Sequence, residues 1–201
     1  MVVRGPTLSL RYATGADADA LFELGSDPEV TRFFSWGPYE RRQQAIAYID
    51  SLAGQRERGE RLEYVIVDSN DRPIGVTGLS ELSRRDRRAV IGTWLGRRHW
   101  GSGANVESKA LLLALAFEAL GLLRVTAWAN PSNARSVSAL ERIGFTREGV
   151  LRSWHVHGGE PRDVAVLGLL RDEWRAGPLA AVAVRIEGAP PPQFVTGPLA
   201  K

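Results

Sequence analysis

The stretch from Arg97 to Phe117, RRHWGSGANVESKALLLALAF, joins a short polar loop to an almost purely apolar run. Its loop contains two arginines and the glycines Gly101 and Gly103. Glycine leaves its backbone N–H unshielded because it has no Cβ, and the first turn of a helix has N–H groups without partners inside the helix. The helix dipole and the guanidinium groups of Arg97 and Arg98 add positive charge there. The stretch therefore predicts an anion-binding loop at the start of a buried helix, and phosphate is the expected anion.

Two common phosphate-binding motifs are excluded by the residues that follow this loop. A P-loop has a lysine directly after its last glycine, but Gly103 is followed by Ala104 and Asn105. The dinucleotide-binding fingerprint needs glycine or alanine where Val106 stands, and an acidic residue about 20 residues later, where the chain reads LLRV. The phosphate is expected to belong to another kind of ligand.

The composition limits the chemistry that the chain can perform. Its 201 residues are 44% hydrophobic, which suits one domain with its own core. There is no cysteine, and the histidines His99, His155 and His157 lack the i,i+4 spacing of a helical metal site, so we expect an organic cofactor and no metal. The sequence contains neither a run of 18 apolar residues nor the apolar region of a signal peptide. We therefore expect a cytoplasmic protein with no membrane partner.

The positive charge of the chain comes almost entirely from arginine. Lys and Arg number 26 against 23 Asp and Glu, a net charge of +3, and the lysines are Lys109 and Lys201. Arginine suits phosphate and carboxylate, but this excess is too small to name a partner. The densest run, residues 84–88, is interpreted as a solvated hairpin turn, with contact to an acidic substrate or RNA as the alternative. No direct contact with nucleic acid is required.

The elements that must position the loop follow from hydrophobic periodicity and turn residues. A capping box at Thr14 and Asp17 predicts the start of the first helix. In the second helix, Ile46, Ile49 and Ala53 are expected to share a buried face. The expected strands are residues 7–13, 61–69, 73–82, 89–96, 123–130, 145–158 and 161–170. The expected helices are 18–25, 41–59, 104–120 and 133–144.

This order predicts a mixed α/β fold whose strands between 61 and 96 form an antiparallel meander. We expect one domain over residues 1–175. From Ala176 onward the chain is rich in small residues and proline, so residues 176–201 are expected to form a loosely attached tail, with a strand-like stretch from Val182 to Ile186.

The pattern Arg98-x-x-Gly101-x-Gly103 resembles the pyrophosphate loop of the GNAT superfamily, the acyl-CoA-dependent N-acyltransferases. The resemblance extends over residues 92–152, which follow that family's order of strand, loop, helix, strand, N-x-R-S, helix and GF. The sequence looks most like the branch of ribosomal-protein N-terminal acetyltransferases (RimJ/RimL-like). YATGADADALFELGSDPEVTRFF near the start, and GGEPRD and DEW near the end, extend this likeness to residues 8–175.

The helix after the loop departs from the family pattern. Ala104 and Asn105 stand where glycine and then tyrosine or a similar residue are expected, and VESKA stands in place of TEA. Glu107 keeps only the acidic position, which also suits the positive end of the helix dipole whatever the function. Backbone amides bind the phosphates in such a loop, so its chemistry is unaffected.

The resemblance implies a central, mostly antiparallel, twisted sheet of about seven strands with helices on both faces and a splayed central strand pair. It implies that the backbone at Trp94 and Leu95 pairs with the pantetheine arm and gives an N–H to the oxyanion. The cofactor-binding residues implied in this way are Trp94, Leu95, Arg97, Arg98, Trp100, Gly101, Ser102, Gly103, Ala104, Asn105, Asn133 and Ser136. Ser136 is the expected proton donor to sulfur. Asn133 and Ser136 would equally suit the start of a helix, and both roles can hold at once.

No residue stands out as a general base. Glu81, late in its strand, is the expected catalytic base, and His155, His157 and Glu160 in the late hairpin are the alternatives. Four aromatic residues between the first two helices could wall an acceptor site or could belong to the core: Phe33, Phe34, Trp36 and Tyr39.

The expected reaction is transfer of an acetyl group from acetyl-CoA to a primary amine by direct attack, with a protein N-terminal α-amine as the expected acceptor. Small amines such as a polyamine or an antibiotic are the alternative acceptors. Two other functions remain open: a non-catalytic acyl-CoA-binding regulator and an RNA-associated module. The sequence leaves open whether the protein is a monomer or a homodimer.

Overall fold

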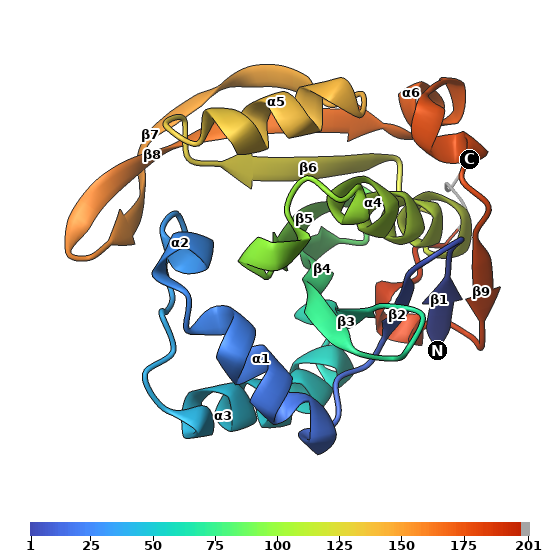
Figure 1. Cartoon of the computed structure of the whole chain (residues 1–201). Coiled ribbons are helices and arrows are strands. Elements are labelled where there is room, and N and C mark those ends of the chain that lie inside the picture. Colours follow the sequence, from blue (N-terminus) through green and yellow to red (C-terminus); the bar gives the residue numbers. More distant parts are fainter. Residues whose placement is uncertain (198–201) are drawn as a thin grey trace.

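The computed structural model describes residues 1–197, and in this part of the chain nine strands form one sheet (Figure 1). The strands are β1 (Val2–Arg4), β2 (Ser9–Arg11), β3 (Arg61–Val67), β4 (Pro73–Ser83), β5 (Arg88–Leu95), β6 (Arg124–Ala129), β7 (Thr146–His157), β8 (Glu160–Leu170) and β9 (Arg185–Glu187). The helices are α1 (Ala18–Gly25), α2 (Pro28–Thr31), α3 (Arg42–Glu57), α4 (Ala104–Ala114), α5 (Ala134–Arg142) and α6 (Arg171–Ala176).

The strand order in the sheet is β7-β8-β6-β5-β4-β3-β2-β1-β9. All neighbouring strands are antiparallel except β5 and β6, which are parallel. The mixed α/β fold and the antiparallel meander from β3 to β5 are thereby confirmed. The described sheet has two strands more than the seven that we expected from the sequence, because the short strands β1 and β9 extend it beyond β2.

The parallel pair β5–β6 opens towards the ends of its strands. Its ladder runs from the Arg88–Arg124 pair to the Ile91–Ala127 pair. Beyond it, Gly92–Leu95 keep their antiparallel partners in β4 and have none in β6. Backbone groups in this part of β5 therefore face a gap in the sheet, which is the splay that the resemblance implied.

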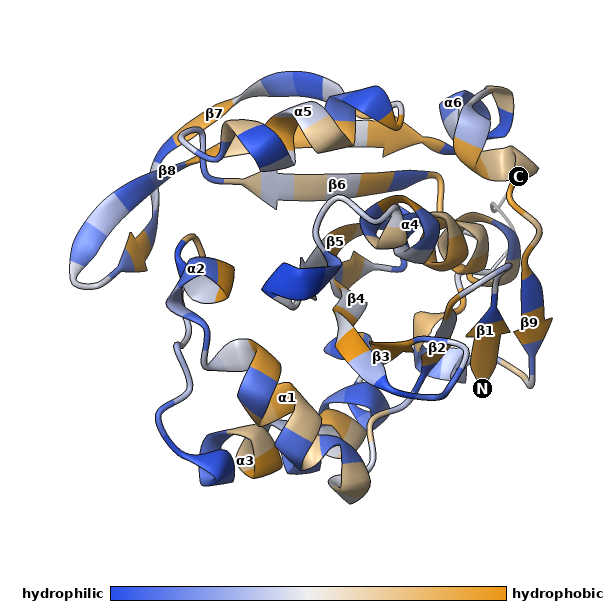
Figure 2. Cartoon of the chain, viewed as in Figure 1, coloured by the Kyte–Doolittle hydropathy of each residue, from blue (hydrophilic) through white to orange (hydrophobic). Residues whose placement is uncertain are grey.

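Helices cover both faces of the sheet, and alternation along β5 divides its side chains between them. Ile91 and Leu95 join the larger core beneath α4 and α5, on what we call the α4 face. Trp94 packs against the smaller core under α1 and α3, on the α3 face. Figure 2 shows hydrophilic colours on the turn before α4 and along part of the β7–β8 hairpin.

Helix α3 buries a different set of residues from the one expected. Ala45, Ile49 and Leu52 are its buried residues, while Ala53 is exposed and Ile46 is only half-buried. The spacing i, i+4, i+7 of the buried set follows one stripe of an α-helix more closely than the expected set does. The expectation for Ala53 was therefore wrong.

The arginine run between β4 and β5 forms a turn, as expected, and Arg84 and Arg85 are exposed. Arg87 is an exception, because its guanidinium donates hydrogen bonds to the carbonyl oxygen of Gly121. β4 itself is irregular before this turn. Its register with β5 shifts between Ser80 and Ser83, and Glu81 has a positive φ of 51°.

The segment after Ala176 packs firmly on the domain, so the expectation of a loosely attached tail was wrong for residues 176–197. The β9 strand pairs with β1, and the side chains of Leu179 and Phe194 are buried in the larger core. Thr196 donates a hydrogen bond of 2.9 Å to the carbonyl oxygen of Leu120. Apolar side chains at intervals along the segment explain this attachment. Residues 198–201 lie outside the described part of the chain.

The strand within this segment begins later than expected, at Arg185 rather than Val182. Within residues 1–197, no helix has the length and apolar character needed to cross a membrane.

Candidate active site

The loop before α4 has the open backbone that anion binding requires. Gly101 and Gly103 have positive φ values of 76° and 89°, and a Cβ added to either would contact nothing within 4 Å. Within the described residues, the backbone N–H groups of Gly101, Ser102 and Gly103 have no hydrogen-bond acceptor. The loop therefore presents unpaired donors at the N-terminus of an 11-residue helix, which is a suitable geometry for phosphate.

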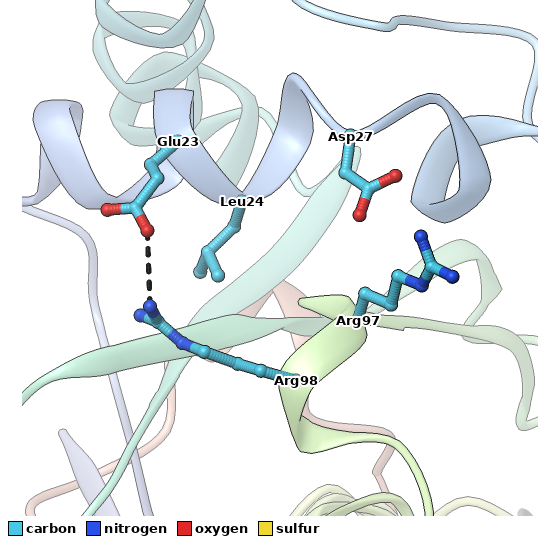
Figure 3. A pocket seen from close by; sticks show the side chains of 5 residues that line it. All are labelled: Glu23, Leu24, Asp27, Arg97 and Arg98. Carbon is cyan, nitrogen blue, oxygen red and sulfur yellow. Dashed lines mark hydrogen bonds and ion pairs between the residues drawn. The ribbon is translucent and has the colours of Figure 1, made fainter.

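Arg97 and Arg98 flank this loop on the side of α1 and α2. With Glu23, Leu24 and Asp27 they line a small open pocket of about 370 Å³ (Figure 3). Arg98 donates a hydrogen bond of 3.1 Å from its NH1 group to Glu23. Both side chains of this pair are more than half exposed, so the pair is weak and a phosphate could displace Glu23.

Trp100, expected to bind the cofactor, anchors the loop through two contacts. Its indole N–H donates a hydrogen bond of 2.9 Å to the carbonyl oxygen of Leu95. The guanidinium of Arg135, on α5, lies 3.6 Å from the centre of its ring. These contacts tie the loop to β5 and α5, so Trp100 positions the backbone amides around it. In a similar way, the side-chain oxygen of Asn105 accepts a hydrogen bond from the ammonium of Lys109.

Glu107 connects the start of α4 to the β1–β2 turn. Its carboxylate accepts hydrogen bonds of 2.8 Å from the backbone N–H groups of Thr7 and Leu8 and a third from the Thr7 hydroxyl. The carboxylate faces protein donors rather than the loop. Glu107 is therefore best interpreted as a structural residue. Its carboxylate holds the β1–β2 turn and also suits the positive end of the helix dipole.

A cavity of about 700 Å³ lies at the gap between β5 and β6. Its walls come from both faces of the sheet: Lys109, Asn133 and Ser136 belong to α4 and α5, whereas Tyr48 belongs to α3. Trp94 also lines it, but Leu95 and the loop residues 97–105 do not. Because residues from both faces line the cavity, it has room for two different molecules to meet at the β5–β6 gap.

At the α4 face of the cavity, Asn133 and Ser136 occupy the start of α5. The Asn133 side chain accepts a hydrogen bond of 3.2 Å from the backbone N–H of Ser136, which makes it the helix cap. Both side chains also line the cavity. The helix-cap contact is thus present for Asn133, and the Ser136 hydroxyl has no hydrogen-bond partner among the described residues.

At the α3 face, the cavity is walled by aromatic side chains. Trp36 packs on Trp94, Tyr39 and Phe34 with ring centroids 5.3 to 5.5 Å apart, and Phe33 also lines the cavity. All four expected aromatic residues are only half-buried. They therefore line the cavity rather than fill the core.

Glu63, on β3, is a cavity residue that the sequence analysis missed. Its side chain is 15% exposed and accepts a hydrogen bond from the Tyr48 hydroxyl. Burial and the Glu63 charge raise the pKa of Tyr48 well above its ordinary value, and the same two causes raise the pKa of Tyr39 to about 12. Both hydroxyls stay protonated at neutral pH. A signal was present, because a glutamate interrupts the apolar stretch LEYVIV.

Only some of the candidate bases lie at the cavity. Glu81, His155 and His157 line the cavity, and Glu160 does not. His155 packs edge-on against Trp128, with ring centroids 5.6 Å apart. Asp163 was also missed; it lines the cavity while accepting a hydrogen bond from the backbone N–H of Ser153. Asp163 lies in the polar first half of β8, among other charged residues, so the sequence gave no distinguishing signal for it.

Comparisons with known proteins agree on one family. Residues 7–146 match the model of the acetyltransferase (GNAT) domain. The chain is 36% identical over 172 residues to the uncharacterized N-acetyltransferase p20 of Bacillus licheniformis, which covers 83% of this chain and 94% of that protein.

Two further relatives have named acceptors. The [ribosomal protein uS5]-alanine N-acetyltransferase of Escherichia coli is 25% identical over 123 residues, covering 60% of this chain and 63% of that protein. The structure of spermidine N-acetyltransferase from Vibrio cholerae in complex with CoA and spermine superposes with a TM-score of 0.72 at 21% identity, covering 83% of this chain and 97% of that chain.

The glycine loop, the opened β5–β6 pair and the cavity between two helical faces occur here in a chain that matches the family model over most of its length. The chain belongs to the GNAT family and is an acyl-CoA-dependent N-acetyltransferase.

Proposed function

We propose that this enzyme transfers the acetyl group of acetyl-CoA to the α-amine of a protein N-terminus by direct attack. The observation that carries the proposal is the cavity at the β5–β6 gap, which has walls on both faces of the sheet. A donor bound from the α4 face and an acceptor bound from the α3 face can meet there without a covalent enzyme intermediate.

The residues around the loop fit a CoA molecule. The free N–H groups from Gly101 to Gly103, with Ala104 at the helix start, would bind the pyrophosphate, and Arg97 and Arg98 would neutralise its charge. The β5 edge at Trp94 and Leu95 has no partner in β6, so its backbone groups are free to pair with the pantetheine arm. Ser102 and Asn105 support the loop from within.

Acyl transfer requires an oxyanion donor, a neutral amine and a proton for the leaving sulfur. We assign the oxyanion donor to a backbone N–H on the free edge of β5. The Ser136 hydroxyl, which lines the cavity, would protonate the thiolate, and Asn133 would hydrogen-bond the pantetheine end while capping α5. Glu81 is assigned as the base, because it lines the cavity and its backbone has the strained φ of 51° that is often found at functional sites.

The α-amine is the preferred acceptor because it is easier to deprotonate. At pH 7, freeing a neutral α-amine with a pKa of about 7.7 to 8.0 costs about 1 kcal/mol, against roughly 4.6 kcal/mol for a lysine amine. A site whose base is an exposed glutamate favours the α-amine as the acceptor. Support for the RimJ/RimL-like branch comes from the sequence resemblance and from the partial match to the uS5-alanine enzyme.

A polyamine is the second candidate, and a specific observation favours it. Glu63, Glu81 and Asp163 all line the cavity, and three carboxylates around aromatic walls suit a ligand with several positive charges. The spermidine enzyme of Vibrio cholerae has the same fold.

An acceptor panel assayed by the release of free CoA separates these candidates. Peptides with a free N-terminus should react faster than the same peptides N-blocked and carrying a lysine, and faster than spermidine. A panel in which spermidine reacts fastest would assign the polyamine function. Release of CoA with lysine peptides alone would contradict both acceptors.

A further inference from the structure

Lys109 is a buried cation in the wall of the cavity. It belongs to α4, its residue is 7% exposed, and it lines the cavity together with the free part of β5 and the start of α5. Its ammonium donates a hydrogen bond of 2.6 Å to the side-chain oxygen of Asn105. None of the ion pairs among residues 1–197 includes it.

This arrangement leaves much of the ammonium unsatisfied. An ammonium has three donors, and Asn105 accepts from one of them. A buried charge without a countercharge is costly, and burial lowers the pKa of Lys109 to about 8. The ammonium is therefore still the main form at neutral pH, with two donors that have no acceptor among the described residues. A methionine would fill the same space without this cost.

The position of Lys109 in the fold limits which ligand its ammonium can bind. Lys109 lies five residues beyond Ala104, where α4 begins after the phosphate loop, and its side chain lines the cavity. The carboxylates that line the cavity belong to β3, β4 and β8, and a positively charged amine would be repelled from the Lys109 end. Oxygen acceptors of the acyl donor are the remaining match.

We propose that Lys109 binds the pantetheine arm of acyl-CoA, donating hydrogen bonds to its amide or hydroxyl oxygens where the arm enters the cavity. This proposal rests on the donor site described under the proposed function. Lys109 would thus be a cofactor-binding residue that the family pattern does not specify, standing within the VESKA departure. A purely structural Lys109, holding only Asn105, is the alternative.

The two roles predict opposite results for Lys109→Met. For the binding role, calorimetric titration should show acetyl-CoA affinity reduced tenfold or more, while affinity for 3′-phospho-ADP, which lacks the pantetheine arm, stays within twofold. The melting temperature should stay the same or rise. Lys109→Gln retains neutral donors and should lie between wild type and Lys109→Met. Arg85→Met, which removes an exposed cation far from the cavity, is the matched control and should leave both affinities unchanged.

Three outcomes would overturn the proposal. The first is unchanged acetyl-CoA affinity in folded Lys109→Met, or in Lys109→Gln if the methionine variant fails to fold. The second is an equal loss for 3′-phospho-ADP, which would mean that the loop itself was disturbed. The third is wild-type protein that binds neither ligand, a result that would remove the donor site of the proposed function as well and is thereby distinguishable from the first two.

Discussion

At the residue scale, Ser136 and Asn133 share one helical turn and are assigned different contributions. The Ser136 hydroxyl lines the cavity and has no partner of its own among the described residues, so its proton is available to a leaving group. The amide oxygen of Asn133 is already engaged as a helix cap. We infer that the serine acts mainly in the transition state and the asparagine mainly in the ground state.

Ser136→Ala should therefore lower kcat by roughly ten- to a thousandfold while leaving acetyl-CoA affinity within about threefold. Asn133→Ala should instead raise KM for acetyl-CoA and lower stability by about 1 kcal/mol, because it removes the helix cap. Steady-state kinetics and thermal melting measure both. Ser132→Ala, an exposed neighbour, is the control. Near-full kcat in Ser136→Ala with a lower Tm would reduce the serine to a structural role.

The buried charge of Lys109 also makes stability depend on pH. Because its pKa is lowered to about 8 in the folded state, the unfolded chain binds more protons between about pH 8 and 10.4. Stability of the wild type should thus rise across this window relative to Lys109→Met, by at most about 3 kcal/mol. Denaturant unfolding of both proteins at several pH values measures the difference between their free energies of unfolding. The contributions of the other titrating groups cancel in this difference. A difference that is constant from pH 7 to 10.5 would mean that Lys109 is not desolvated.

At the scale of elements, the loop and α4 act as one unit. The loop conformation depends on glycine at a φ of 89°, where a β-branched residue is strained. Gly103→Val should lower acetyl-CoA affinity tenfold or more, about 1.4 kcal/mol or above. Gly149→Val is the control, because Gly149 has equally open surroundings without a positive φ. An unchanged dissociation constant in folded Gly103→Val would remove this loop from the binding site.

The first turn of α4 is fixed by Glu107. Glu107→Ala deletes three hydrogen bonds to the β1–β2 turn and should lower the free energy of unfolding by about 1–3 kcal/mol. Chemical denaturation measures this loss. Glu118→Ala, an exposed carboxylate further along the same helical segment, should have little effect. If the two variants are equally stable, the carboxylate serves only the helix dipole.

Most elements could be predicted from the sequence because their patterns are local. The strands β3 to β5 are marked by apolar stretches between turn residues, and the start of the first helix by Thr14 and Asp17. These signals depend on near neighbours alone, and the structure contains the elements that they predict. β1 was not expected as a strand, and β9 was expected only as part of the stretch 182–186, since each has three residues and is stabilised by its partners rather than by its own pattern. The C-terminal packing likewise depends on Phe194, whose burial involves residues distant in sequence.

The candidate site was less predictable than the fold. The glycine loop, Asn133 and Ser136 followed from local motifs and a family resemblance. Asp163 reaches the cavity only through strand register and the β5–β6 gap, which no local pattern encodes, and the glutamate within the apolar stretch of β3 was the one local sign of Glu63. The roles of Trp100 and Asn105 were also hidden, because their partners Arg135 and Lys109 are identified only in three dimensions.

At the scale of the whole molecule, the C-terminal segment is part of the stabilising core. Phe194→Ala should lower the free energy of unfolding by about 3–5 kcal/mol, because the ring is fully buried. Equilibrium denaturation measures the loss, with Val150→Ala as an exposed control. Removal of residues 177–201 should reduce stability still further, since it also deletes Leu179 and the β9 strand. A truncated protein as stable as the full chain would restore the interpretation as a loose tail.

The cavity with walls on both faces of the sheet has a consequence for how such an enzyme can diversify. Its α4 face is built from regular helices and a short loop, whereas its α3 face is bordered by the irregular segment 32–41 and by the end of a hairpin. Substitutions in those two borders can alter the shape and charge offered to an amine while leaving the thioester side intact. New acceptor preferences can thus arise in stepwise fashion, through variants that each retain a working donor site.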